Sequence, residues 1–279
     1  MLDLARIVRA HPRLFVLTGA GVSTDSGIPD YRDDAGSWKR KAPVTLQEFM
    51  RSAALRRRYW ARSMIGWPVI AQARPNAAHR AIVRLEAAGR VHRLVTQNVD
   101  GLHQCAGSTD VVELHGSLAR VGCVECGAEL TRLDVQERLE AANPSYRNLS
   151  AASAPDGDAD LDQDALDAFE VPACPRCGGL LKPCVVFFGD SVPRARVDAT
   201  MRALEETDAM LVVGSSLMTY SGYRFCEHAH RLGKPIAAIN LGRTRADALL
   251  SVKVERSCTA VLAALVDSLD TAGPVIETV

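Results

Sequence analysis

The sequence predicts an α/β fold, a Rossmann-like, doubly wound parallel sheet that carries a smaller zinc-binding domain as an insertion. Short apolar runs recur along the chain and alternate with helix-like segments, as expected for parallel strands buried on both faces. This rhythm stops between His115 and Cys184, and two Cys-x-x-Cys pairs lie inside the gap. A metal ion can stabilise an insertion that is too short to build its own core.

Each expected strand is a short apolar run. These runs cover residues 14–18, 91–96, 111–114, 185–188, 210–213, 236–239 and 252–254. Most of them end in small or polar residues. In a doubly wound sheet, ligands bind at these carboxyl ends of the strands, so we expect a ligand crevice along one edge of the sheet.

Helices are expected between the strands, at residues 45–59, 77–88, 193–206, 223–231 and 259–269, and within the gap at residues 133–142. Residues 150–163 are rich in Ala, Ser, Asp, Pro and Gly and are expected to form a mobile loop. We assign residues 1–116 and 185–279 to the Rossmann-like domain and residues 117–184 to the inserted domain. A helical part, at about 35–75, is expected to join the smaller domain.

Composition narrows the range of partners. Lys and Arg balance Asp and Glu, 33 against 33, so net charge gives no reason to expect direct nucleic-acid binding or an anionic membrane as a partner. No window approaches about 20 unbroken apolar residues, and the first ten residues have no apolar core of a secretory signal. Eight cysteines without such a signal favour reduced thiols plus a metal, and we expect a cytoplasmic protein.

The two cysteine pairs have the spacing of a zinc site. A spacer of two residues lets both thiolates of a pair reach one tetrahedral ion at about 2.3 Å, and the glycine that follows each pair permits a tight turn. Redox-active pairs or reduced core cysteines are the alternative, but two matched pairs that flank one segment favour zinc. With four protein ligands no position is left for substrate, so this ion would be structural. The ligands are Cys123, Cys126, Cys174 and Cys177.

A glycine-rich turn, Gly19-Ala20-Gly21-Val22-Ser23, follows the first predicted strand. Such a turn can bring backbone N–H groups to a pyrophosphate. The G-x-G-x-x-G fingerprint is not met, because Thr24 stands at the third glycine position, and no acidic residue clearly ends a second strand. Taken alone, the turn fits a structural role equally well.

Further segments favour the cofactor role. GIPDYR at 27–32 and TQNVDGLH at 96–103 occur with the glycine turn, HG at 115–116, both cysteine pairs, VVFFGD at 185–190, GSSL at 214–217 and NLG at 240–242. In this order, and over essentially the whole chain, they resemble the sirtuin family of NAD-dependent protein deacylases. RRRYWAR, GWP and YSGYRFC resemble the class II branch, whose best-known member is mitochondrial, and the excess of Arg over Lys suggests a bacterial source.

The resemblance implies that NAD is a co-substrate and that an acyl-lysine attacks its ribose carbon as nicotinamide leaves. It implies catalytic roles for His115, Asn98 and Asp100. His115 would be the general base that takes a proton from a ribose hydroxyl, whereas a lone histidine is otherwise more often structural. Asn98 would hold the ribose or a water, and Asp100, with the backbone of Val99, would bind the nicotinamide carboxamide.

The resemblance also implies further contacts to NAD. Tyr31 would shield the developing cation from water, while Asp30 and Arg32 could instead form a structural ion pair. The expected contact residues are Gly19, Ala20, Gly21, Ser23, Asp30, Tyr31, Arg32, Gln97, Asn98, Val99, Asp100, Gly214, Ser215, Ser216, Asn240, Leu241, Gly242 and Cys258.

The substrate peptide is expected between the zinc domain and the main sheet. The segment Phe188-Gly189-Asp190 resembles the part of the family that pairs with the substrate backbone as an added strand. Val185 and Val186 could line an apolar tunnel, although core packing would explain them equally. Cys184 stands where the family usually has Asn or Asp, which could alter acyl preference or leave a harmless buried thiol.

Tyr59 and Arg62 have the Tyr-x-x-Arg spacing that places a phenol and a guanidinium at the acyl pocket in the desuccinylating branch of the family. One helical turn separates them, and arginine can bind a carboxylate through two hydrogen bonds. A pair on a helix surface is the alternative. We therefore hypothesise a preference for acidic or branched acyl groups over acetyl.

The sequence thus predicts an NAD-dependent protein lysine deacylase that releases nicotinamide and O-acyl-ADP-ribose, with acyl-lysine side chains of proteins as its partners. A protein mono-ADP-ribosyltransferase would use the same cation with a different nucleophile. A non-catalytic NAD sensor that binds a partner through its zinc module is a third possibility. The presence of His115, Asn98 and Asp100 together argues against the sensor.

Overall fold

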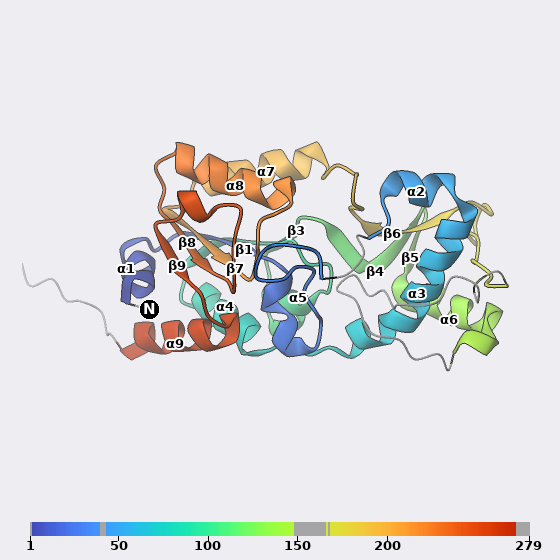
Figure 1. Cartoon of the computed structure of the whole chain (residues 1–279), viewed down its shortest axis with the longest axis horizontal. Coiled ribbons are helices and arrows are strands. Elements are labelled where there is room, and N and C mark those ends of the chain that lie inside the picture. Colours follow the sequence, from blue (N-terminus) through green and yellow to red (C-terminus); the bar gives the residue numbers. More distant parts are fainter. Residues whose placement is uncertain (1, 40–42, 148–165, 167, 272–279) are drawn as a thin grey trace, which may run out of the picture.

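The computed structural model describes residues 2–39, 43–147, 166 and 168–271. The loop expected at residues 150–163 lies outside these described residues. Two sheets lie side by side along the long axis of the molecule (Figure 1). Within the described ranges, no helix combines the length and apolar character needed to cross a membrane.

The larger sheet has six parallel strands in the order β3-β2-β1-β7-β8-β9. This is the strand order of a dinucleotide-binding Rossmann fold, in which the direction of winding reverses between β1 and β7. The predicted doubly wound parallel sheet is confirmed. The strands are β1 (Leu14–Thr18), β2 (Val91–Thr96), β3 (Val111–Glu113), β7 (Ala209–Val213), β8 (Ile236–Ile239) and β9 (Val252–Val254).

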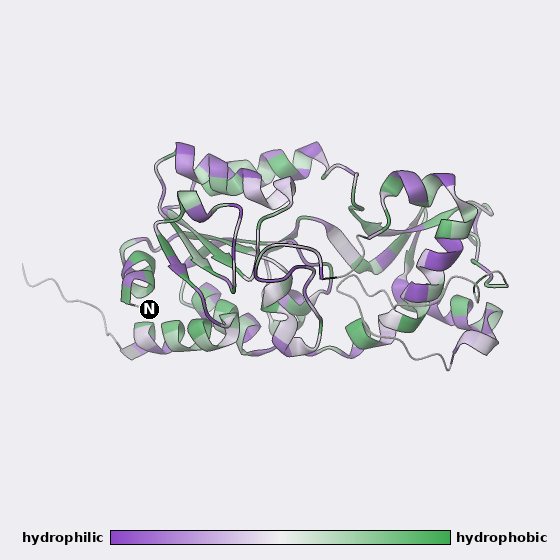
Figure 2. Ribbon diagram, in the orientation of Figure 1, coloured by the Kyte–Doolittle hydropathy of each residue, from purple (hydrophilic) through white to green (hydrophobic). Residues whose placement is uncertain are grey.

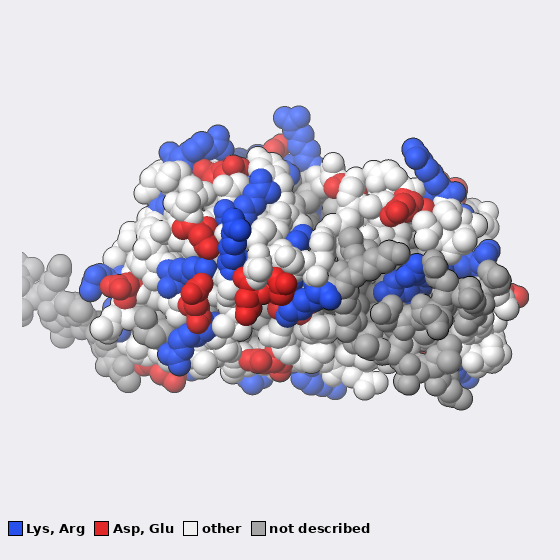
Figure 3. Space-filling view, viewed as in Figure 1, with Lys and Arg blue, Asp and Glu red and all other residues white. Residues whose placement is uncertain are grey.

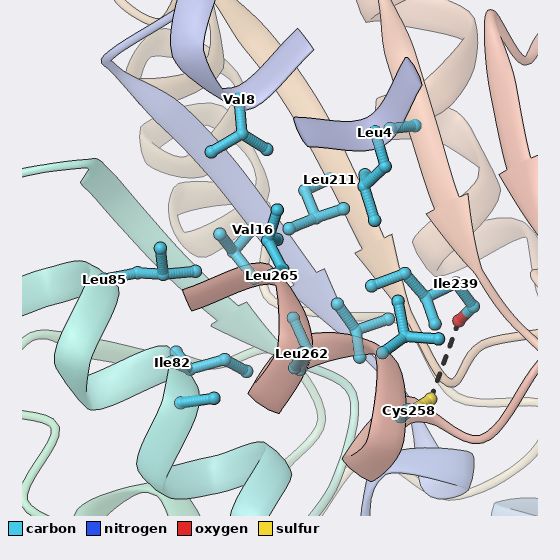
Figure 4. Close-up of a cluster of buried hydrophobic side chains, with 14 of the residues drawn as sticks. Leu4, Val8, Val16, Ile82, Leu85, Leu211, Ile239, Cys258, Leu262 and Leu265 are labelled. Carbon is cyan, nitrogen blue, oxygen red and sulfur yellow. Dashed lines mark hydrogen bonds between the residues drawn. The ribbon is translucent and has the colours of Figure 1, made fainter. Parts of the chain in front are cut away.

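Helices cover both faces of this sheet (Figure 1). On one face, α1 (Leu2–Ala10), α4 (Ala77–Ala87) and α9 (Cys258–Thr271) pack against alternate strand residues such as Val16 and Leu211 (Figure 4). On the other face, the remaining strand residues pack on α7 (Arg194–Glu205) and α8 (Tyr220–Arg231), with Phe225 at the centre. Figure 2 shows the strands of the larger sheet mostly green, whereas the helices carry green and purple residues together. Burial on both faces explains why these strands are continuous apolar runs.

The smaller sheet is antiparallel, in the order β5-β4-β6, and carries the cysteine pairs. Its elements are β4 (Gly116–Cys123), β5 (Glu129–Thr131), β6 (Leu181–Val185) and α6 (Arg132–Ala142), with the short α5 (Leu102–Ala106) belonging to the larger unit. Two helices from earlier in the chain, α2 (Leu46–Arg51) and α3 (Ala53–Gln72), pack on it through Phe49 and Trp60. The boundaries at 116 and 185 remain our proposal.

Two expected elements are corrected. The run 185–188 does not form a strand, because β6 ends at Val185 and the chain then turns, with Asp190 N donating to the carbonyl of Phe187. The side chains of this run are apolar because Phe187 enters the core of the smaller module while Val186 packs on the core of the larger one. The helix expected at 45–59 is two helices, since Ser52 is extended and caps α3.

Arg132 is a buried cation at the start of α6, only 1% exposed. It lies over the ring of Trp67 at 4.9 Å and donates to Gln136 and to the backbone and side-chain oxygens of Ser63. Burial lowers its pKa to about 10, so it stays charged at neutral pH. These contacts join α3 to α6 and compensate the cost of burying the charge.

At the surface, basic and acidic side chains are interspersed over the visible face (Figure 3), in keeping with the balanced composition. Neither sign of charge forms a continuous field on this face.

Two glycine turns meet where the winding reverses. Gly21 N donates to the carbonyl of Gly214 at 2.8 Å, and Gly19 N donates to that of Val213 at 3.0 Å. Gly214 has a φ of +60°, and a Cβ atom on it would lie 2.3 Å from the backbone nitrogen of Val22. No side chain fits at this point, so glycine is required for the two turns to close against each other.

We expect Gly214→Ala to reduce the free energy of unfolding by about 3 kcal/mol, from backbone strain and overlap with Val22, whereas Gly89→Ala should cost about 1 kcal/mol. Gly89 is a matched control because its φ is also positive, at +67°, but a Cβ there meets nothing within 4 Å. Urea unfolding followed by circular dichroism measures both values. Equal losses would show that the close contact of the two turns does not matter.

Candidate functional site

A cavity of about 420 Å³ opens at the carboxyl ends of the central strands, with walls from both modules. Its volume lies in the range of small-molecule and cofactor sites. The turns after β1, β2, β7 and β8 form one wall, and Tyr59, Leu118 and residues 185–189 form the other. The ligand crevice expected from the strand ends is therefore present.

Most of the predicted site residues line this cavity. They are Gly19, Ala20, Gly21, Ser23, Asp30, Tyr31, Arg32, Tyr59, Gln97, Asn98, Val99, Asp100, His115, Val185, Val186, Phe188, Gly189, Gly214, Ser215, Ser216, Asn240, Leu241 and Cys258. They come from positions 19 to 258 of the chain, so the fold brings them together. Their individual roles remain proposals.

Apart from the zinc ligands, three predicted site residues are not among those lining the cavity. Gly242 packs on another loop, because a Cβ there would lie 2.4 Å from the Cα of Asp34. Asp190 is exposed, and its carboxylate accepts from the N–H of Ser191. Arg62 lies one turn beyond Tyr59 on α3, and the structure brings only Tyr59 to the cavity. That Arg62 reaches an acyl carboxylate therefore remains a proposal.

The N–H groups of the glycine turn were expected to bind a pyrophosphate, but most of them have backbone partners in this structure. The N–H groups of Gly19, Gly21, Val22 and Ser23 all donate to backbone carbonyls. They are thus already used in shaping the turn. The hydroxyls of Ser215 and Ser216, on the facing turn after β7, line the cavity and remain suited to a phosphate or ribose.

His115 follows β3 and is held at both ring nitrogens. Its Nδ1 lies 2.9 Å from the carbonyl of Gln97, which can only accept, so Nδ1 carries the proton. Its Nε2 therefore accepts from the Ser221 hydroxyl, 2.8 Å away. Burial lowers the pKa of His115 to about 4, the Gln97 contact opposes this, and the charge of Arg196 adds to the lowering. The imidazole is thus neutral at pH 7, as a general base must be.

Asp100 and Asn98 are linked through Ser23. Ser23 Oγ donates to Asp100 Oδ2 at 2.8 Å, and Asn98 Nδ2 donates to Ser23 Oγ at 3.1 Å. Burial raises the pKa of the Asp100 carboxyl, while hydrogen bonds from Leu102 N and Ser23 oppose the shift. The turn after β1 and the loop after β2 thereby form one polar wall of the cavity.

Gln97 connects Ser215 and His115 in one wall of the cavity. Its side-chain amide donates to Ser215 Oγ at 2.7 Å, while its backbone carbonyl holds His115. A Cβ atom on Gly222 would lie 2.5 Å from Gln97 Oε1, so the start of α8 leaves room for this amide only because residue 222 is glycine. Ser221 and Gly222 lie in the YSGYRFC segment, but that segment indicated only the branch of the family and not a role at the site.

The mouth of the cavity is aromatic. Tyr31, Trp38 and Phe188 pack edge to face with ring centroids 5.3 to 6.3 Å apart. The alternative of an Asp30–Arg32 ion pair is not seen in the described residues, because Asp30 pairs with Lys39 and Arg32 lies 3.9 Å over the ring of Trp38. Tyr31 lines the cavity, and its role in shielding the cation remains a proposal.

Two buried histidines that the motif analysis did not single out lie behind the cavity wall. His103 Nε2 lies 2.9 Å from Thr18 Oγ1, and its ring centroid lies 4.9 Å from that of His79. His79 in turn contacts Asn76, whose Nδ2 donates to the carbonyl of Val22. Burial lowers the pKa of His79 to about 4 and that of His103 to about 3. Both are therefore neutral, and they link α4 and α5 to the glycine turn.

The four predicted zinc ligands come together. All four Sγ atoms lie within 4.8 Å of one another, with Cys123 to Cys177 at 3.5 Å and Cys126 to Cys174 at 3.8 Å. Tetrahedral zinc with bonds of about 2.3 Å needs sulfurs about 3.8 Å apart. The glycines that follow each pair, at 127 and 178, have positive φ, as the turn requires. The cluster therefore fits one structural zinc ion with four protein ligands.

Cys184 does not line the cavity. A Cβ atom on Gly122 would lie 3.4 Å from its Sγ, so the thiol faces β4 within the smaller sheet. Of the two interpretations of this position, the structure supports a packed thiol. A change here acts on the pairing of β4 with β6 and leaves the cavity lining unchanged.

A cavity at the reversal of winding is where doubly wound sheets bind nucleotides, so fold and site together define a dinucleotide-binding α/β protein with a zinc module. Residues 19–221 match the model of the Sir2 family. The chain belongs to this family, the sirtuins, which confirms the predicted resemblance.

Curated relatives support the same assignment. The chain is 60% identical over 262 residues to the NAD-dependent protein deacetylase of Xanthomonas campestris, covering 94% of this chain and 89% of the relative. It is 60% identical over 254 residues to that of Bordetella bronchiseptica, covering 91% and 93%. It is also 47% identical over 263 residues to the mitochondrial NAD-dependent protein lipoamidase sirtuin-4 of Bos taurus, covering 93% and 84%. The predicted likeness to a mitochondrial class II sirtuin is confirmed.

Solved structures agree over nearly the whole chain. A Sir2 complex with a p53 peptide and NAD⁺ superposes with a TM-score of 0.76 at 27% identity and covers 97% of this chain and 98% of that one. A structure from work on the mechanism and regulation of Sir2 enzymes gives a TM-score of 0.76 at 30% identity, covering 96% and 97%.

The purified protein should hold one zinc ion per chain through the cysteine cluster. We expect Cys174→Ser to lose the metal and to lower Tm by at least about 10 °C, because the bound ion contributes folding free energy. Cys105→Ser, which changes an exposed thiol outside the cluster, should alter neither value. Metal analysis and calorimetry give both quantities. Full zinc content in Cys174→Ser would contradict the ligand assignment.

Stability should fall as the pH drops below about 6.5. The folded-state pKa values of His79, His103 and His115 lie below the unfolded value of about 6.5, so the unfolded chain takes up protons first. Each histidine can remove up to about 2 kcal/mol between pH 6.5 and 5.

Urea unfolding at pH 7.5, 6 and 5 checks this slope. His79→Gln should make the pH dependence shallower, because glutamine does not titrate. His230→Gln, at an exposed position, is the control and should leave the slope unchanged. The same slope in all three proteins would disprove the assignment to buried histidines.

Proposed function

We propose that this chain is an NAD-dependent protein lysine deacylase, which transfers the acyl group of an acyl-lysine to ADP-ribose and releases nicotinamide. The observation that carries the proposal is His115, a neutral imidazole that lines the cavity and whose Nε2 accepts a hydrogen bond from Ser221. Membership of the Sir2 family and the named activity of the bacterial relatives support it. We also propose the cytoplasm as its location, from the thiols that the zinc site needs in reduced form.

When bound, NAD supplies a ribose carbon that becomes electron-poor as nicotinamide departs. The chain's part is to bind, orient and accept a proton. Asp100 and the backbone of Val99 would hold the carboxamide, and Asn98 the ribose. Ser221 now occupies Nε2 of His115, so this hydroxyl must move aside before Nε2 can take the proton of a ribose hydroxyl.

The acyl pocket is proposed at the apolar end of the cavity. Tyr59, Leu118, Val185, Val186 and Phe188 line it, with Phe187 beside them. Cations lie beside this end of the cavity, because Arg32 lies over the ring of Trp38, which packs on Phe188, and Lys182 lies 4.9 Å over the ring of Phe187. We therefore keep the proposed preference for acidic or branched acyl groups over acetyl. The acetyl group would fill this pocket least completely.

A panel of peptides that carry different acyl-lysines, with and without NAD, tests the function. We expect NAD-dependent loss of the acyl group, with branched or acidic acyl groups removed about ten times faster than acetyl, because the larger groups fill more of the pocket. His115→Ala should lower kcat by about 100-fold or more and leave NAD binding and Tm intact.

Mass spectrometry of the products separates this activity from its alternatives. Formation of O-acyl-ADP-ribose supports the deacylase. A protein substrate that gains ADP-ribose while keeping its acyl group would establish the transferase instead. Binding of NAD without turnover of any acyl peptide would instead support the non-catalytic NAD sensor.

A further inference from the structure

The first turn of α8 carries two tyrosines that are each covered by arginines. Arg245 lies 4.4 Å from the ring centroid of Tyr223 and 5.6 Å from that of Tyr220, and Arg224 lies 5.0 Å from the ring of Tyr220. Tyr220, Tyr223 and Arg224 share one face of the helix because they are three and four residues apart. Tyr220 remains 53% exposed, which is unusual for so large a ring. We call these four residues the Arg-Tyr platform.

The Arg-Tyr platform stands at the rim of the cavity. Thr219 and Ser221 both line the cavity, whereas Tyr220 between them is exposed to solvent. Ser221, which follows Tyr220 in the chain, contacts the proposed base His115. Arg245 is tied to the same rim, because its backbone N–H donates to the carbonyl of Ser216 at 2.8 Å.

The arginines of the platform have no carboxylate partner among the described residues. Arg224 donates through Nε to the carbonyl of Tyr220 at 3.5 Å, and Arg245 through Nη1 to that of Met218 at 3.4 Å. Asp247, the acid two residues beyond Arg245, is engaged by Thr244 and Lys253. Most guanidinium N–H groups therefore remain available for an outside acceptor.

Two further features make this rim electropositive. The 12-residue helix α8 begins at Tyr220, and neither a capping side chain nor an acidic residue offsets the positive end of its dipole. A guanidinium held over a tyrosine ring can still present N–H groups to a carboxylate, which accepts two hydrogen bonds from it. The arginines held over the tyrosine rings and the positive end of the α8 dipole therefore favour the same ligand, a small anion at the rim.

We propose that the Arg-Tyr platform binds an acidic side chain that flanks the acyl-lysine in the protein substrate. This inference rests on the proposed function, because it is the acyl-lysine in the cavity that brings its neighbours to the rim. Successive side chains of an extended peptide lie about 3.3 Å apart along the strand, so a residue within three positions of the lysine can reach the platform. The enzyme would then select substrates by local sequence as well as by acyl group.

Peptides that share one acyl-lysine and differ at the three positions on either side test the platform. At each position Glu is compared with Gln, Lys and phosphoserine, at low salt and at 0.5 M salt. We expect one position at which Glu raises kcat/KM about tenfold over Gln, through KM, with the preference weakened by salt. The double variant R224Q/R245Q should reduce this preference to less than about twofold.

R231Q is the matched control, since Arg231 is an exposed arginine at the far end of the same helix. It should keep the full preference for Glu. Turnover of the Gln peptide reports the basal activity and should be equal in all three proteins. If the Gln peptide is not turned over at all, the proposed function fails and not the platform.

Two results would overturn the inference. One is a wild-type enzyme that treats Glu and Gln alike at all positions, and the other is a double variant that keeps the preference. A preference for phosphoserine above Glu that the double variant loses supports the same anion site with phosphate as the ligand.

Discussion

The site depends on one backbone contact, that of the turn after β1 with the turn after β7. Because no side chain separates Gly21 from Gly214, the two turns lie close enough for Ser23 and Ser215 to face one cavity. Gln97 bridges to Ser215, and Ser23 bridges to Asp100, so the loop after β2 is fixed against both turns. The position of His115 follows, since the backbone of Gln97 holds its ring. A backbone contact between two glycines thus fixes the positions of the polar side chains of the site.

Much of the fold could be predicted because its strongest constraint, burial on both faces, leaves a direct trace in the sequence. The strands at 14–18, 91–96, 236–239 and 252–254 begin and end where the apolar runs do. The cysteine spacing was equally direct, because coordination geometry allows few alternatives. The run 185–188 was misjudged, since side chains that enter two different cores look like a buried strand in one dimension.

The rest of the site could not be read from the sequence, because it depends on contacts between distant segments. Ser221 is an ordinary helix residue until the fold places it 2.8 Å from His115. His79 and His103 become a pair only when α4 and α5 pack together. The spacing of Tyr59 and Arg62 predicted that both lie on one helix. It could not predict how that helix is rotated against the core, and of the two residues only Tyr59 lines the cavity. The motifs predicted the kind of chemistry, but the packing of distant segments determines which side chains contact one another.

The helix α3 has a mechanical consequence. It runs for 20 residues, about 30 Å, from the aromatic core of the zinc module to the chain that leads into Asn76. Asn76 holds the carbonyl of Val22 and the hydroxyl of Ser26, on either side of the polar turn that bears Ser23. A tilt of the zinc module would therefore move this wall of the cavity through α3, apart from what the helix absorbs by bending at Pro68. A zinc ion held by the cysteine cluster, although remote from the reacting atoms, would thus help to fix the helix that supports this wall.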